Sequence, residues 1–311
     1  MGVPFIFWLL FHVFVFAVLA LDLGVFHRTA HAVSKREALA WTVCWVALSL
    51  VFNAGVYYWM GTQKALEFLT GYALEYSLSM DNIFVFVLLF RYFSVPPRYQ
   101  HRVLFWGIVG ALVMRGTMIA LGTLLLARFR WILYLFGAFL FYTGVRMAGP
   151  RHLEVDPEHN PVLKLVRRWW RVTERYEGQH FFVRRERGLY ATPLLVVLAA
   201  VETTDLVFAV DSVPAVFGIT QDPFIVYTSN VLAILGLRSL YFLLAAVIES
   251  FQYLHIGLGM VLAFVGAKML VAWAVHIPVT QSLAVIVAIV SISMVVSWWK
   301  PRREAKRAAS D

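Results

Sequence analysis

Long apolar runs dominate this chain and decide what it can fold into. Nine of them are bounded by charged residues, Pro or Gly, at 5–26, 38–58, 68–90, 101–122, 128–148, 192–214, 224–246, 252–275 and 280–299. A helix needs about 20 apolar residues to cross a bilayer. The chain is 61% hydrophobic and 14% charged, which is far from the composition of soluble proteins. We therefore predict an all-α integral membrane protein with about nine transmembrane helices.

Basic residues gather in alternate loops between these runs. The loops predicted on the opposite side hold only Lys64, Arg128 and Arg130, whereas the 149–190 loop and the C-terminal tail are rich in Arg and Lys. Because cytoplasmic loops carry the excess of Lys and Arg, we predict the N-terminus outside and the C-terminus in the cytoplasm. This distribution accounts for the net charge of +9, so no nucleic-acid partner is expected.

Two of the apolar runs contain carboxylates, which are rare in membrane spans. The first holds Glu75 and Asp81-Asn82, and the second holds Glu202, Asp205 and Asp211-Ser212. An ionised group at the centre of a span costs about 2.5–3.5 kcal/mol, so the five acids together would cost roughly 12–17 kcal/mol. Such a cost requires compensation by protons, by a bound cation, or by the intramembrane bases Arg115, Arg238 and Lys268.

The side chains in these two stretches favour a hard cation. Carboxylate, amide and hydroxyl oxygens suit Mg²⁺, Ca²⁺ or Mn²⁺. Neither stretch contains His, and Cys44 is the single cysteine of the chain, which argues against a zinc or copper site. Asp22 at the end of the first run is a further candidate for the ion path. Interhelical salt bridges to the three bases stay open as the alternative.

The two acidic stretches belong to an internal repeat. Six positions separate Glu75 from Asp81 and Asp205 from Asp211, and seven separate the glycines at 137 and 144 as well as those at 259 and 266. The first copy would begin outside and the second inside, which predicts a 3+3 inverted repeat of the kind found in secondary transporters. The divisions are then 1–65 (two leading helices), 66–148 (first repeat), 149–190 (cytoplasmic basic loop), 191–276 (second repeat) and 277–311 (last helix and basic tail).

The spacing of the acids also bears on helix shape. Six residues of an ideal helix advance about 9 Å and turn about 600°, so the two carboxylates of one stretch face different neighbours. A kink or break near each acidic motif would bring them together. Pro214 after Asp211 supports this expectation for the second stretch.

Both acidic stretches, together with Tyr227-Thr-Ser-Asn-Val-Leu-Ala-Ile-Leu-Gly-Leu-Arg238 and Gly266-Ala-Lys268-Met269, resemble the TerC/Alx family of bacterial membrane proteins. The resemblance runs from Asp22 to Lys268 and beyond. It implies an exporter of Mn²⁺ in the bacterial inner membrane, with the motif acids carrying the ion and Mn²⁺ as substrate rather than cofactor. The expected partners are then the lipid bilayer and a divalent cation, and the oligomeric state stays open.

Two readings from other classes remain beside transport. One is a membrane redox or tellurite-resistance module, which a single cysteine and the lack of a haem or flavin motif disfavour. The other is a scaffold that recruits partners through the 149–190 loop. Such a scaffold would tolerate loss of the acids but not of the loop. We expect a transporter with no organic cofactor, and no enzyme.

Overall fold

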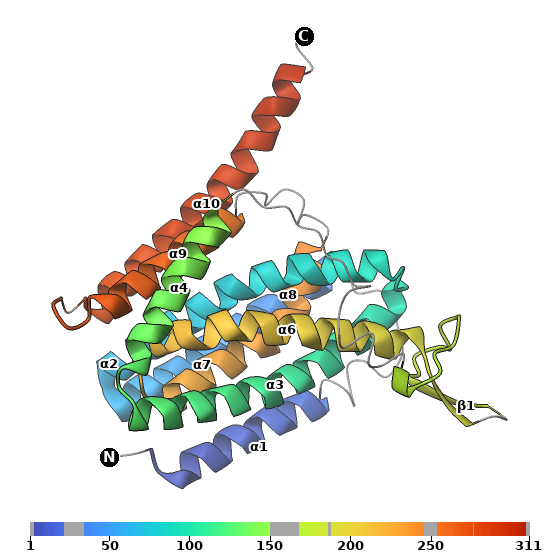
Figure 1. Cartoon of the computed structure of the whole chain (residues 1–311), viewed down its shortest axis with the longest axis horizontal. Helices are drawn as coiled ribbons and strands as arrows, with labels where there is room; N and C mark the ends of the chain where they lie inside the picture. Colours follow the sequence, from blue (N-terminus) through green and yellow to red (C-terminus); the bar gives the residue numbers. More distant parts are fainter. Residues whose placement is uncertain are drawn as a thin grey trace.

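The computed structural model describes residues 3–21, 34–149, 168–185, 188–245, 254–275 and 277–308. Its helices are α1 (Phe5–Leu21), α2 (Lys35–Tyr92), α3 (Pro97–Arg128), α4 (Ile132–Ala148), α6 (Pro193–Phe217), α7 (Pro223–Leu235), α8 (Leu237–Leu244), α9 (Leu254–Leu270) and α10 (Val279–Ala308) (Figure 1). A short antiparallel hairpin joins β1 (Phe182–Arg185) to β2 (Gly188–Ala191). The expected helical membrane architecture is confirmed for the described residues, with this hairpin as an addition.

Four of the described helices are long and apolar enough to cross a membrane: α2, α3, α6 and α10. The pair α7 and α8, bent by 41° at Gly236, would make a fifth span. The helices α1, α4 and α9 are apolar but have only 17 residues each. The count of nine spans and the inverted repeat therefore stay predictions.

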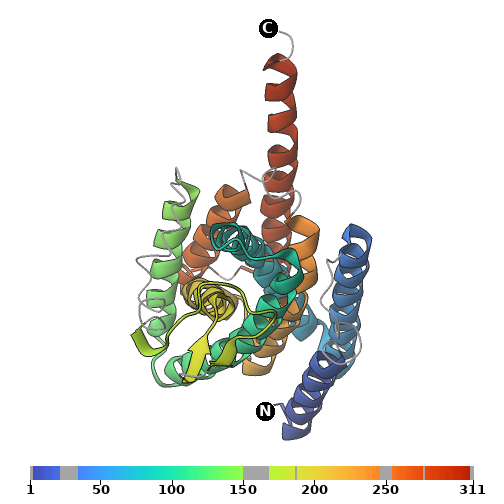
Figure 2. The same ribbon diagram turned by 90° about the vertical axis from the view of Figure 1, so that its right-hand side faces the viewer.

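Helix α2 contains the predicted second and third spans in one element of 58 residues. A straight helix of that length would measure about 87 Å, nearly three times the bilayer core. The chain breaks at Gly61, whose φ of 83° and ψ of 174° lie outside the helical region. Positive φ values are readily available only to glycine, so this residue permits the change of direction. Figure 2 shows α1 and the first part of α2 together on one side of the molecule.

Both acidic motifs lie in continuous helix, so the predicted break at them is wrong. Within α2 only Gly61 has non-helical backbone angles, and α6 is helical from Pro193 to Phe217 with Pro214 inside it. Hydroxyls near both motifs donate to carbonyls of their own intact helices. Ser77 donates to the Ala73 carbonyl over 2.6 Å, and Thr203 to that of Ala199 over 2.6 Å.

Helix α6 packs against α2 and α3, and α7 packs along α2 (Figures 1 and 2). The tightest helix pair is α4 with α9, where glycines bring the two backbones together. A Cβ added to Gly144 would lie 2.6 Å from the Gly259 carbonyl oxygen, and one added to Gly266 would lie 2.6 Å from the Gly137 carbonyl oxygen. Close approach of this kind is typical of small residues at membrane helix interfaces.

The hairpin and the described residues before it, 168–185 and 188–191, form what we call the hairpin segment, which docks on the turn between α2 and α3. The Tyr176 hydroxyl donates to the Phe93 carbonyl over 2.7 Å, and the Arg102 guanidinium lies 5.3 Å from the centroid of the Phe181 ring. These contacts tie part of the predicted 149–190 loop to the helix bundle. Residues 150–167 of this loop lie outside the described residues.

Candidate functional site

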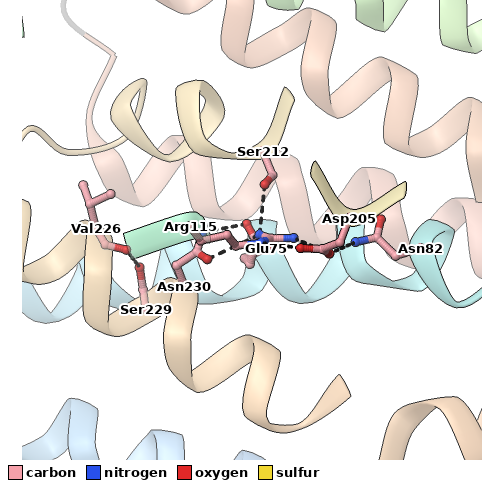
Figure 3. A network of polar contacts seen from close by, with 8 residues as sticks. All are labelled: Glu75, Asn82, Arg115, Asp205, Ser212, Val226, Ser229 and Asn230. Carbon is pink, nitrogen blue, oxygen red and sulfur yellow. Dashed lines mark hydrogen bonds and ion pairs between the residues drawn. The ribbon is translucent and has the colours of Figure 1, made fainter. Parts of the chain in front are cut away.

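The centre of the candidate site is Arg115 on α3, whose side chain is 1% exposed. Its guanidinium forms ion pairs with Glu75 of α2 and Asp205 of α6 (Figure 3). For Asp205, Arg115 Nη2 lies 3.2 Å from Oδ1 and Nε lies 3.4 Å from Oδ2. One base therefore joins an acid from each of the two motifs.

Three uncharged side chains complete this group. Asn230 of α7 donates to Glu75 Oε2 over 2.9 Å and accepts from Arg115 Nη1 over 3.3 Å. Ser212 Oγ accepts from Arg115 Nη1 over 3.0 Å, and Asn82 Nδ2 donates to Asp205 Oδ1 over 3.4 Å. All six side chains are buried. We call Glu75, Asn82, Arg115, Asp205, Ser212 and Asn230 the Arg115 cluster.

A cavity of about 410 Å³ adjoins the Arg115 cluster. Its charged lining consists of Asp81 of α2, Arg146 of α4 and Asp211 of α6, together with Glu75 of the cluster. Asn82, Thr143 and Ser212 add neutral oxygens to the same wall. We call this space the acidic cavity. Its other lining residues are apolar and come from α2, α4, α6 and α9: Leu78, Met147, Phe208 and Leu262.

The charges of the cluster and the cavity do not balance. Four carboxylates (Glu75, Asp81, Asp205, Asp211) stand against two guanidinium groups (Arg115, Arg146). With every group ionised, carboxylates outnumber bases by two within these groups, and by one when Arg238, which is buried beside Asp205, is counted with them. A divalent cation or protons would offset this excess, which removes a cost of several kcal/mol for ions held in a membrane.

Six of the seven side chains predicted as metal ligands therefore meet at the cluster or the cavity: Glu75, Asp81, Asn82, Asp205, Asp211 and Ser212. The seventh, Glu202, lies against Gly110 of α3 and lines neither.

The three bases predicted to compensate the acids lie in different places. Arg115 pairs with two acids, so the salt-bridge alternative holds for Glu75 and Asp205. Arg238 lines a small pocket beside Asp205, whereas Lys268 lines a different cavity. Asp22 lies outside the described residues.

Asn230, Thr143 and Arg146 were not among the site residues predicted from the sequence. Asn230 could have been found, because an amide in the middle of an apolar run has to hydrogen-bond to another helix. No three His, Cys, Asp or Glu side chains are arranged to hold a metal in the part of the chain that the structure describes. Two of the acids are instead bound by Arg115, which occupies the place between them.

Most of the chain matches a known family of membrane proteins. The model of the integral membrane protein TerC family matches residues 60–305, which contain both acidic motifs and the Arg115 cluster. The chain belongs to the TerC family. Every residue of this family member that forms the Arg115 cluster or lines the acidic cavity lies within the matched residues.

Relatives of this TerC family member are similar over nearly their whole length. An uncharacterized membrane protein of Myxococcus xanthus is 51% identical over 95% of this chain and 92% of its own. The putative membrane-bound redox modulator Alx is 47% identical in Salmonella typhi and 46% identical in Escherichia coli K12, in each case over 98% of both chains. No solved structure matches the chain.

Proposed function

We propose that this TerC family member is a secondary transporter that carries a divalent cation through the acidic cavity. The observation that carries the proposal is the excess of carboxylates over basic groups at the cluster and the cavity. The carboxylate, amide and hydroxyl groups there offer oxygen ligands, which suit Mg²⁺, Ca²⁺ and Mn²⁺. The resemblance to manganese exporters selects Mn²⁺ and export from the cytoplasm of a bacterium.

The contact of α4 with α9 supports an alternating-access mechanism. Gly137 faces Gly266, and Gly144 faces Gly259, although the repeat equates Gly137 with Gly259 and Gly144 with Gly266. Such exchanged pairs are what a two-fold axis between two equivalent helices produces. An axis of this kind relates the halves of inverted-repeat transporters, whose binding sites lie between them.

Arg115 acts in this proposal as a built-in countercharge. Its single positive charge is shared by Glu75 and Asp205 while no metal is present, so the carboxylates of the cluster and the cavity still outnumber the bases. An incoming dication would share these carboxylates with the guanidinium. Ser212 and Asn230 would hold the guanidinium in place during that exchange, because both accept from its Nη1.

Metal uptake by reconstituted vesicles tests the proposal, with Mn²⁺, Ca²⁺, Mg²⁺ and Zn²⁺ compared as substrates. Asp81→Asn and Asp211→Asn should each abolish Mn²⁺ uptake, because each removes a charge needed to offset a dehydrated dication. Both variants should still fold, since a neutral amide is less costly in a membrane than an ionised acid.

Trp169→Ala is the control variant, because its side chain is 73% exposed on the hairpin segment. It should retain uptake. Ordinary Mn²⁺ uptake by both Asn variants would rule out the cavity as the ion path.

The names of the Alx relatives supply a competing proposal, a redox module. Cys44 is the single cysteine, so the chain can form no dithiol of its own. Mn²⁺ flux in vesicles that hold only this protein separates the two proposals, because a redox module would need an added electron donor or thiol partner to act.

A further inference from the structure

A second cavity, of about 690 Å³, lies away from the acidic cavity and shares no lining residue with it. It is bordered by α2 just after the Gly61 break, by the turn between α6 and α7, and by the connection from α9 to α10. Loop charge predicts that this end faces outward. Its charged and hydroxyl-bearing side chains are Lys64, Glu67, Thr220, Asp222 and Lys268. We call it the Lys64 cavity.

The Lys64 ammonium is held in this cavity by oxygens from both repeats. Its Nζ lies 2.8 Å from Glu67 Oε2 and 3.2 Å from Asp222 Oδ2. The Thr220 hydroxyl donates to the same Glu67 Oε2 over 2.5 Å, and Gln63 Nε2 donates to Oε1 over 3.3 Å. Two carboxylates and a hydroxyl thus surround a positive charge, with the donor types that a hard dication prefers.

The second segment of α2 connects the two cavities. Glu67 lines the Lys64 cavity, whereas Glu75 and Asp81 line the acidic cavity. The segment is continuous helix, so these three acids lie about 12 Å and then about 9 Å apart along its axis. Glu67 is buried, at 8% exposure. One helix therefore carries three carboxylates from one cavity to the other.

Lys64 is suited to give way to another cation. It has a flexible four-carbon stem, its charge is a compact ammonium, and its side chain is 31% exposed, so it can turn toward solvent. Lys268 lines the same cavity, and among the described residues it forms no ion pair within 4.0 Å. Its charge would remain near Glu67 and weaken the hold on a departing metal.

We propose that Glu67, Asp222 and Thr220 form a second binding site for the transported divalent cation, and that Lys64 occupies it as a tethered cation until the metal arrives. The inference rests on the proposed function for its role in transport. Its binding chemistry can be tested separately from transport.

The test uses the full-length protein carrying Asp81→Asn and Asp211→Asn, in which the acidic cavity has lost its excess charge. Mn²⁺ bound to the purified protein is measured by the paramagnetic resonance of free Mn²⁺ at equilibrium. Adding Lys64→Met should give a further bound Mn²⁺ per chain, and adding Glu67→Gln to that variant should remove it. Gln63→Met is the matched control, because it removes a contact to Glu67 without a change of charge, and it should add no metal.

A second measurement needs no change to the cavity. In the unaltered chain, Mn²⁺ should raise the rate at which an impermeant amine reagent modifies Lys64, compared with choline at equal ionic strength. Absence of the added Mn²⁺ in the Lys64→Met variant, or its persistence with Gln at position 67, would overturn the proposal, as would an unchanged Lys64 rate. Vesicles that take up no Mn²⁺ would instead count against the proposed function and leave this binding result in place.

Discussion

Replacing Arg115 by Met tests directly whether the guanidinium stabilises the two buried acids of the Arg115 cluster. The guanidinium is 1% exposed and its partner Glu75 is 0% exposed, so the variant leaves two buried acids without their base. Removing one partner of a buried ion pair costs about 3–5 kcal/mol. That loss is a large part of the total stability of a typical domain, about 5–15 kcal/mol. We expect Arg115→Met to lower the free energy of unfolding by this amount.

The matched variant removes the charges as well as the base. Adding Glu75→Gln and Asp205→Asn to Arg115→Met leaves neutral amides, which should restore most of the lost stability. Unfolding of the purified protein in mixed micelles, followed by circular dichroism against denaturant, gives the free energies of the three proteins. A change of less than about 0.5 kcal/mol in Arg115→Met, typical of a surface substitution, would refute the reasoning. So would a triple variant no more stable than the single one.

Three other predictions concern topology, packing and coupling. In a Cys44→Ser background, Gln63→Cys should react with an impermeant thiol reagent added outside and Ser94→Cys should not. Labelling of both from the same side would contradict the inverted orientation of the two repeats. Gly144→Leu should cost about 1–3 kcal/mol of unfolding free energy because its Cβ would meet the backbone of α9, whereas the exposed Ala138→Leu on the same helix should be nearly neutral in the same denaturation assay. In vesicles permeable only to K⁺, Mn²⁺ that enters down its own gradient should shift the lumenal pH, because protons move in exchange. Mn²⁺ flux with no pH change would contradict proton coupling and indicate a uniporter.

Much of the candidate site could be predicted from the sequence because charge is rare in apolar runs. Each ionised side chain in a membrane span needs a partner, so the acids of the two motifs and Arg115 could be expected to meet. The equal spacing of the two motifs pointed to the same conclusion. In the structure, Arg115 joins Glu75 and Asp205, the first acids of that spacing.

The parts that escaped prediction depend on contacts between distant segments. Glu67 accepts a hydrogen bond from the Thr220 hydroxyl, which is 153 positions away in the sequence, and no local sequence pattern predicts that pair. Glu202 lies one helical turn before Asp205 and shares its face, yet a glycine on α3 gives it a separate place. The break in α2 lies at Gly61 rather than at the motif, because glycine permits a positive φ that the motif residues adopt only with strain.

The charge count at the site also constrains the transport cycle. In the proposed transporter, a dication or protons would offset the excess of carboxylates, so either form could cross the apolar layer at similar electrostatic cost. A form with neither would carry the charge uncompensated, and its population would be low. Because the halves can then exchange sides only when loaded with metal or with protons, each outward step with Mn²⁺ would be followed by an inward step with protons. In the proposed transporter, the excess charge that would bind the metal is thus the same feature that would couple its export to the proton gradient.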